Sequence, residues 1–243
     1  MTDSNRLEVG LPIGDEVDAS PAKRPARTTL QGRLGRLTPL DPSAHGDALF
    51  EAMGGDAGNK LWAYLFEGPF PDRAAFDEHL RRIAASEDPL FFSIVDQTSG
   101  RAVGYASYMR IDPAHRVIEV GSILFTPLLQ RTPLATEAMY LMARYVFDVL
   151  GYRRYEWKCN ALNAPSRKAA LRLGFTFEGI FRQHMIVKGR NRDTAWFSIL
   201  DSEWPTRKAN FEHWLDSSNF VPDGQQKVAL TALTAGTHIP KSV

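Results

Sequence analysis

The sequence predicts a single domain of the α/β class, in which helices pack on the faces of a mixed sheet. Three strand-like segments follow one another over 90–96, 102–111 and 117–125, and turn residues join them. Segments with helical signals lie both before and after this group. From about residue 30 to residue 205 the pattern continues without a linker rich in Pro, Gly or Ser and without an internal repeat, which indicates one domain.

The composition narrows the classes of function. The chain has 243 residues with 29 Lys and Arg against 28 Asp and Glu, so its formal net charge is +1. This balance gives no broad electrostatic reason to bind nucleic acid or an anionic membrane. Cys159 is the only cysteine, which excludes an intramolecular disulfide and argues against a cysteine-based zinc site. No run of apolar residues has the length of a membrane span, and the N-terminus lacks the basic start and apolar block of a secretory signal, so we expect a cytoplasmic protein.

Both ends of the chain are expected to lie outside the domain. Residues 1–29 mix Asp, Glu, Gly, Pro and Ser with isolated apolar residues, which predicts a flexible or loosely docked N-terminal arm. Residues 206–243 are expected to form a C-terminal helix and a tail, and from about Pro222 the tail has the same mixed character.

The first half of the domain is predicted from turn and capping residues. A short strand over 33–40 is followed by Asp-Pro, which opens a helix that extends to Met53. Glycines within 54–58 interrupt the chain, and the aromatic-rich connection LWAYLFEGPFP follows. Asp72 can cap a second helix over 73–85.

The second half alternates helices and strands. A mostly apolar helix over 133–150 is expected to pack on the sheet and to end at Gly151. A strand over 154–159, a helix over 164–173 and two strands that flank a turn at 188–193 complete the domain.

Common catalytic and metal-binding motifs are absent from the sequence. There is no GxxxxGK[ST], GxGxxG, HExxH or GxSxG, and the six histidines show no metal-ligand spacing. We therefore expect no metal cofactor.

The segment from 117 to 138 is the candidate for chemistry. An apolar strand leads into a loop, and the loop leads into the start of the long helix, where Thr132 can serve as N-cap and Pro133 as the first helical residue. Such a helix start presents free N–H groups that suit a phosphate, and Arg131 could add a charge-assisted contact. The alternative is a well-capped core helix without a ligand.

Four segments follow in a fixed order, namely LATEA at 134–138, GYRRYEWKCNALNAPS at 151–166, RKAALRLGFTFEGIFR at 167–182 and RDTAWFSILDSEW at 192–204. Together they resemble the GNAT acetyltransferase superfamily and, within it, the RimJ/RimL type. The resemblance implies a central, mostly antiparallel sheet with helices on both faces and a parallel pair of strands at the cofactor cleft. It further implies transfer of an acetyl group from acetyl-CoA, as cosubstrate, to a primary amine of a protein N-terminus or a small molecule. No nucleic acid or membrane partner is expected, and a homodimer stays open.

The family's pyrophosphate loop, Q/R-x-x-G-x-G/A, falls on residues 130–135. Gln130 and Ala135 match it, whereas Pro133 replaces a glycine and cannot donate an N–H. The resemblance assigns cofactor binding to Ile123, Leu124, Phe125, Gln130, Arg131, Thr132, Leu134, Ala135 and Asn163. The alternative, which Pro133 favours, is a non-catalytic module of the same fold that binds CoA or a partner.

Glu119 is predicted to be the general base. It is the only charged residue of its apolar strand, where an unpaired carboxylate would be costly and burial would raise its pKa. By alternation it shares a face with Gly121, Ile123 and Phe125, and Gly121 is expected to leave open space beside the carboxylate. In relatives that use a base on this strand, a Glu precedes the loop Gln by eleven residues, as Glu119 precedes Gln130. The alternative is a structural Glu that pairs with an Arg or accepts backbone hydrogen bonds.

Asn163 and Ser166 match the family's N-x-x-S at the start of the next helix. The resemblance gives Asn163 a contact with the cofactor arm, and makes Ser166 the acid that protonates the departing CoA thiolate. The alternative for both residues is ordinary helix capping. Cys159 alternates with polar neighbours along its strand, so we expect a small buried hydrophobic residue there, not a nucleophile.

Two further segments have open interpretations. The resemblance places the aromatic connection against the acetyl group, and its members could supply apolar walls for the acceptor: Trp62, Tyr64, Phe66 and Phe70. The alternative is packing beneath the loop or a subunit contact. The second segment is a basic hairpin with Lys188, Arg190 and Arg192, which is either a solvated turn or a contact for a phosphate or an acidic acceptor.

Overall fold

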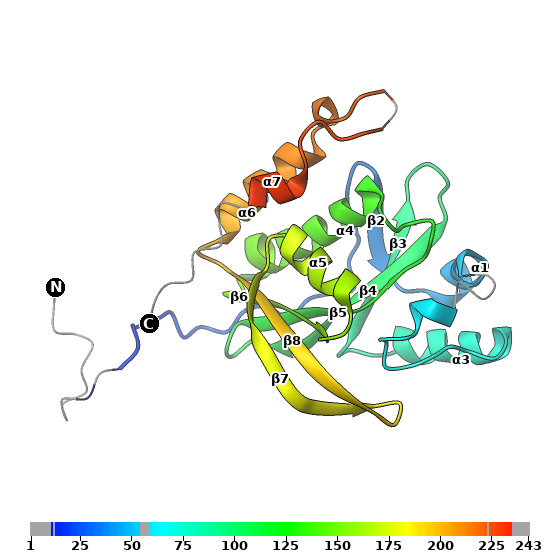
Figure 1. Ribbon diagram of the computed structural model, residues 1–243, viewed down its shortest axis with the longest axis horizontal. Helices are drawn as coiled ribbons and strands as arrows, with labels where there is room; N and C mark the ends of the chain where they lie inside the picture. The colour runs from blue at the N-terminus through cyan, green and yellow to red at the C-terminus, as the bar shows by residue number, and fades with distance from the viewer. Residues whose placement is uncertain (1–10, 12, 54–58, 223, 235–243) are drawn as a thin grey trace.

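One sheet organises the chain in this computed structural model, which describes residues 11, 13–53, 59–222 and 224–234 (Figure 1). Within these residues eight strands follow the order β1-β2-β3-β4-β5-β6-β8-β7. They are β1 Leu30–Gln31, β2 Gly35–Pro39, β3 Leu90–Asp96, β4 Ala102–Asp112, β5 Val117–Phe125, β6 Arg154–Asn160, β7 Thr176–Val187 and β8 Arg190–Leu200. All neighbouring strands are antiparallel except β5 and β6, which are parallel. The predicted fold class is confirmed.

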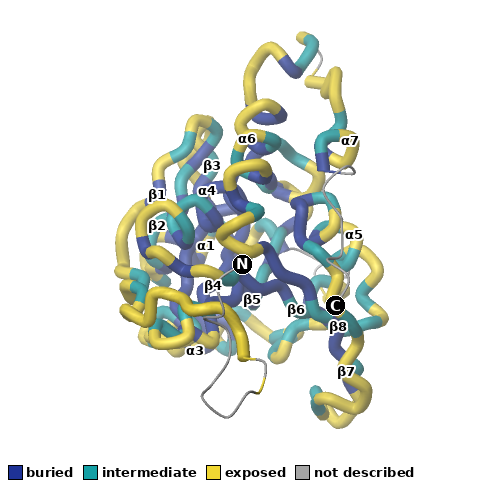
Figure 2. Tube along the Cα trace, turned by 90° about the vertical axis from the view of Figure 1, so that its left-hand side faces the viewer, coloured by how far each residue is buried: buried dark blue, intermediate teal, exposed yellow. Residues whose placement is uncertain are grey.

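Helices cover both faces of this sheet. The helical elements are α1 Pro42–Ala52, α3 Arg73–Ala84, α4 Pro133–Arg144, the π-helical turn η1 Tyr145–Leu150, α5 Ala164–Arg172, α6 Trp204–Leu215, the 3-10 turn η2 Ser217–Asn219 and α7 Leu230–Thr234. The buried apolar side chains form two clusters, one that includes α1 and α3 and one that includes α4. Phe91 on β3 belongs to the cluster of α1 and α3, whereas its neighbour Phe92 belongs to the cluster of α4. Because successive strand residues point to opposite faces, the two clusters are the two sides of the sheet. Figure 2 shows the buried segments along the central strands.

Local signals account for the helix boundaries. The Asp41 carboxylate accepts a hydrogen bond from the amide of Ser43, and the Asp72 carboxylate accepts one from Ala75, so both predicted N-caps are confirmed. Gly151 follows η1 with a φ of 76°, the left-handed conformation that glycine adopts most easily. The predicted break over 54–58 lies outside the described residues.

The strand expected over 33–40 is interrupted, because a buried carboxylate from α4 organises a turn there. Glu137 accepts hydrogen bonds from the amides of Arg33, Leu34 and Gly35 at 2.8–3.0 Å. The chain therefore turns between β1 and β2 instead of running straight. Glu137 is a charged residue of a mostly apolar helix, and it is buried in the structure.

The ends of the chain pack along the domain where they are described. In the predicted N-terminal arm, the Ala22 amide donates to Pro113 and the Lys23 amide donates to Leu150. The expected C-terminal helix is α6, which begins at Trp204, before the boundary expected at residue 206, and packs on α4. No helix among the described residues is both long and apolar enough to cross a membrane.

Candidate functional site

The parallel pair of strands opens into a cleft. Pairing of β5 with β6 runs from Val117 opposite Arg154 to Val120 opposite Trp157 and then stops. Beyond Val120 the two strands diverge, so β6 does not use the amides on that edge of β5. The cleft has a volume of about 1320 Å³ and is lined by the ends of both strands and by the first turns of α4 and α5.

A buried carboxylate stands at one end of the cleft. Glu119 is 3% exposed and lines the cleft. Its Oε2 accepts a hydrogen bond from Arg110 Nη1 at 2.7 Å and lies 3.0 Å from Lys158 Nζ. The closest contacts of both cations are to Oε2, and Oε1 accepts no hydrogen bond within the described part of the chain. One carboxylate oxygen is therefore left for a ligand.

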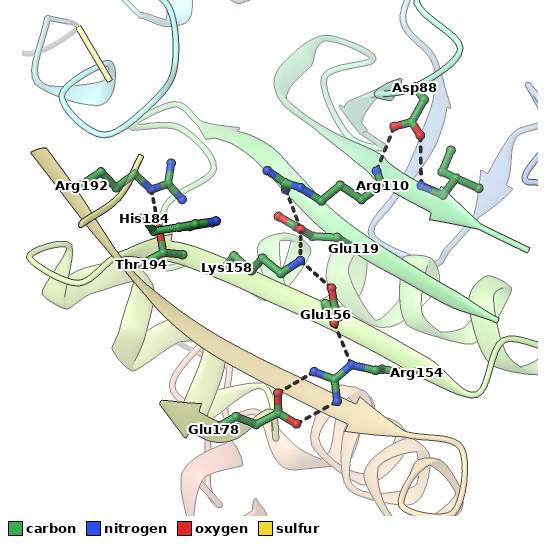
Figure 3. A network of polar contacts seen from close by, with 11 residues as sticks. Asp88, Arg110, Glu119, Arg154, Glu156, Lys158, Glu178, His184, Arg192 and Thr194 are labelled. Atoms are coloured by element: carbon green, nitrogen blue, oxygen red, sulfur yellow. Dashed lines mark hydrogen bonds and ion pairs between the residues drawn. The ribbon is translucent and has the colours of Figure 1, made fainter. Parts of the chain in front are cut away.

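The ion pairs continue from Glu119 across the sheet (Figure 3). Lys158 Nζ lies 2.6 Å from Glu156 Oε2 and 3.8 Å from the centre of the Trp196 ring. Glu156 accepts a hydrogen bond from Arg154 Nε at 2.7 Å, and Arg154 pairs in turn with Glu178. The network places alternating charges on one face of β5, β6 and β7, and it fixes the position of the Glu119 side chain.

Opposing influences act on the pKa of Glu119. Burial raises the pKa above its ordinary value, while Lys158 and then Arg110 oppose the rise. The net direction is upward. A carboxylate with a raised pKa can accept a proton more readily near neutral pH than a solvated one.

Two expectations about the neighbourhood of Glu119 are wrong. Gly121 does not leave open space, because a Cβ there would lie 2.3 Å from Met109 Sδ; the thioether fills the position. Glu119 also does not share a face with Ile123 and Phe125. Both of these pack with the cluster of α4, on the other side of the sheet.

A β-bulge explains the change of face. Ser107 pairs with Gly121 and Tyr105 pairs with Leu124, so β5 contains one residue more than β4 between the two pairs. Ser122 has a φ of 49°, in the left-handed region. The additional residue reverses the alternation, and Leu124 instead of Ile123 continues the face of Glu119.

The loop before α4 lines the cleft. Arg131 has a φ of 62°, a conformation that is uncommon for a residue with a side chain. Thr132 caps α4 by accepting from the Ala135 amide, and its own amide donates to Leu129. The amides of Arg131 and Leu134 make no hydrogen bond among the described residues. The amides of Arg131 and Leu134 are thus available for a phosphate, whereas those of Thr132 and Ala135 are already in use.

The side chains expected to hold a cofactor are mostly brought together. Gln130, Arg131, Thr132, Ala135 and the end of β5 line the cleft, whereas Leu134 is buried beside it. Gln130 Nε2 donates to the carbonyl of Phe125, so this side chain closes the loop onto the strand. Four further basic residues line the cleft that the sequence had not indicated as site residues, namely Lys60, Lys158, Lys168 and Arg172.

Asn163 and Ser166 lie at the start of α5, on the opposite wall. The Asn163 side chain accepts from the Ser166 amide, so the capping role is present. Ser166 Oγ accepts a hydrogen bond from Trp157 Nε1 at 3.0 Å, which leaves the hydroxyl proton to be donated. Burial raises the pKa of Cys159, a neighbour of Ser166, and this keeps its thiol protonated, consistent with the expected core residue.

The aromatic connection divides into two parts. Tyr64 and Phe66 line the cleft. Trp62 is 4% exposed and belongs to the cluster of α1 and α3. Its ring packs edge to face against the rings of Phe70 and His79, with centroid distances of 5.0 and 5.8 Å. Trp62 and Phe70 therefore support the wall and do not form it.

Further residues that line the cleft were not predicted to do so from the sequence. Trp214 at the end of α6 lines the cleft and stacks on the Arg172 guanidinium, whose carbon lies 4.9 Å from the ring centre. Lys158 and Met109 lie beside Glu119 on neighbouring strands. No group of three or more His, Cys, Asp or Glu suited to a metal ion occurs among the residues that the structure describes.

Comparison with known proteins identifies the family. The acetyltransferase (GNAT) domain family matches residues 36–176, which is more than half of the chain. The chain therefore belongs to the GNAT acetyltransferases. A solved GCN5-related N-acetyltransferase from Brucella melitensis is 53% identical, with a TM-score of 0.87 over 89% of this chain and 98% of that one.

Two curated relatives are more distant. The uncharacterized N-acetyltransferase p20 of Bacillus licheniformis is 31% identical over 113 residues, which are 46% of this chain and 63% of that protein. The ribosomal-protein-serine acetyltransferase of Escherichia coli (strain K12) is 28% identical over 102 residues, which are 42% of this chain and 56% of that protein. The aligned stretch thus spans less than two thirds of either relative. The RimJ/RimL-like resemblance is confirmed at modest identity.

Proposed function

We propose that the chain is an acetyl-CoA-dependent N-acetyltransferase that acts on a primary amine. The observation that carries the proposal is that the buried Glu119 carboxylate and the start of α4 line the same cleft. Membership of the GNAT family supports the same reaction.

The cosubstrate fits the chemistry of the residues at the helix starts. The unpaired amides of Arg131 and Leu134 can donate to phosphate oxygens, and the partial positive charge of the α4 start favours an anion. Lys168 and Arg172 add positive charge on the opposite wall of the cleft. When bound, acetyl-CoA supplies the activated acetyl group.

The residues of the cleft then have separate tasks. Glu119 Oε1 takes the proton that the amine loses when it attacks the thioester carbonyl. Amides of β5 near Ile123 to Phe125 stabilise the negative charge that develops on the carbonyl oxygen. Ser166 returns a proton to the sulfur as the C–S bond breaks. Neither a covalent intermediate on the enzyme nor a metal ion takes part.

The experiment combines the purified chain with acetyl-CoA and a panel of primary amines, and measures release of the CoA thiol together with the mass of the product. Amine-dependent thiol release with a product heavier by one acetyl group is expected. Pro133, which has no N–H at the first position of α4, favours a second candidate, a non-catalytic module that binds CoA or a partner. Tight CoA binding without thiol release for any amine would support that candidate and contradict catalysis.

A further inference from the structure

A buried arginine at the Glu119 end of the cleft has no acidic partner within the part of the chain that the structure describes. Arg192 on β8 is 6% exposed and lines the cleft. Its Nε donates to Thr194 Oγ1 at 3.3 Å, and its guanidinium carbon lies 5.0 Å from the centre of the Phe66 ring. Neither of its terminal nitrogens has a hydrogen-bond or ion-pair partner among the described residues. The solvated-turn interpretation of the basic hairpin is therefore wrong for this residue.

Arg192 and Glu119 are on the same side of the sheet. On β8, Thr194 pairs with Asn160 and Trp196 pairs with Lys158, the residue that binds Glu119. Arg192 precedes Thr194 by two positions, so the alternation keeps it on that face. Figure 3 shows its guanidinium extending from β8 toward the side where Arg110 and Glu119 lie.

The charges around Arg192 leave its own charge uncompensated. The neighbouring network contains three cations and three anions, which are Arg110, Lys158, Arg154, Glu119, Glu156 and Glu178. These six cancel, and Arg192 adds one positive charge. A guanidinium stays protonated in proteins, and a buried charge without a counter-ion is costly. An anion bound in the cleft would compensate this charge.

The geometry suits a carboxylate. Thr194 holds Nε, and the Phe66 ring packs against the guanidinium plane, so the two terminal nitrogens keep a fixed direction. A guanidinium with both terminal nitrogens available binds a carboxylate through two parallel hydrogen bonds. Glu119, the candidate base, is near enough to act electrostatically on Arg192 without a direct contact.

We propose that Arg192 determines acceptor specificity by binding a carboxylate of the acceptor, so that the substrate is a primary amine that also carries an acidic group. This inference rests on the proposed function, because it concerns the acceptor of the same reaction. Two classes of acceptor carry such a carboxylate. In a free amino acid it is the α-carboxylate, and in a peptide it is an acidic side chain near the N-terminus. The test distinguishes these two classes.

The test compares acceptors that differ in one carboxylate. One arm pairs free amino acids with their carboxamides, and the other pairs amidated peptides that carry Asp or Asn at the second position. We expect kcat/KM to favour the carboxylate by about 10- to 100-fold in one arm, as for a charge-assisted pair. Arg192→Gln should reduce the preference to about 1 with an unchanged KM for acetyl-CoA. Arg192→Lys should keep part of it, and the exposed Arg190→Gln should keep all of it.

A binding experiment separates this proposal from the proposed function. N-acetylated amino acids and their carboxamides are titrated calorimetrically into the chain in the presence of CoA. Binding that depends on the carboxylate and that Arg192→Gln removes supports the role of Arg192, even if no amine is acetylated. Such binding without acetylation of any amine would contradict the proposed catalytic function but not the role of Arg192. Turnover without a carboxylate preference overturns the proposal and leaves the proposed function intact. The same holds if Arg192→Gln raises only the KM for acetyl-CoA. Absence of a carboxylate preference in both turnover and binding also overturns it.

Discussion

Replacing Glu119 with Gln keeps the shape of the side chain and removes one negative charge from a buried network. Removing one partner of a buried ion pair costs about 3–5 kcal/mol when the other charge is left alone. Here Lys158 keeps Glu156 at 2.6 Å, and the Arg110 side chain is 40% exposed. We therefore expect a smaller loss in the free energy of unfolding, at most about 1 kcal/mol, because burial already favours the uncharged form of this side chain in the folded protein, and we expect the variant to fold.

The effect on catalysis should be larger than the effect on stability. Loss of a general base lowers kcat by about 10²-fold or more near pH 7. Glu156→Gln is the matched control, since Glu156 lies opposite Glu119 in the β5–β6 register, contacts the same Lys158 and does not line the cleft. It should lose similar stability and keep most of its activity. Steady-state kinetics and thermal unfolding of both variants measure the two effects, and equal losses of activity would refute a catalytic role for Glu119.

The pH dependence follows from the raised pKa of Glu119. A base acts when deprotonated, so kcat/KM should rise with pH through a pKa above the ordinary 4.5, and Glu119→Gln should lack this acid limb. Because the folded-state pKa is raised, the stability that this carboxyl contributes is present below pH 4.5 and is lost as the pH rises through the higher value. A wild-type profile that is flat above pH 4.5 would contradict the assignment.

Four other variants test separate parts of the structure. Pro133→Gly restores an amide at the start of α4 and should leave CoA affinity unchanged or increase it; calorimetry that shows a clear loss would contradict the binding geometry. Trp62→Ala should lower the free energy of unfolding by about 3–5 kcal/mol in denaturant titrations, since the ring is buried, and a change in acceptor KM without this loss would contradict its supporting role. Phe66→Ala should raise the acceptor KM, because this ring lines the cleft; an unchanged value argues against an acceptor contact. Glu137→Gln should destabilise the turn before β2 by about 1–3 kcal/mol, and hydrogen exchange of the Arg33 to Gly35 amides should then accelerate; unchanged exchange would contradict this account.

Local signals predicted much of the fold. The strands over 90–96 and 117–125 occur at the residues expected, and Asp41, Asp72 and Thr132 cap the helices that follow them. These features depend on neighbours within about four residues, which the sequence displays directly.

Features that depend on strand register could not be predicted in this way. The pairing of Glu119 with Lys158 needs the alignment of β5 with β6, and the free guanidinium of Arg192 needs that of β6 with β8. The bulge at Ser122 follows Gly121, a residue type that often marks a bulge in a strand, but its position depends on the pairing with β4, and it changes which side chains face Glu119. Strands and helix caps were thus easier to predict than the contacts that depend on how the strands align.

A crystal structure of the chain with CoA would show directly whether the cleft between β5 and β6 holds the cosubstrate. We expect electron density for CoA between these strands, with its pyrophosphate within hydrogen-bond distance of the Arg131 and Leu134 amides. The thiol should lie between Ser166 Oγ and the Glu119 end of the cleft. CoA bound elsewhere, or a pyrophosphate away from the start of α4, would contradict this expectation.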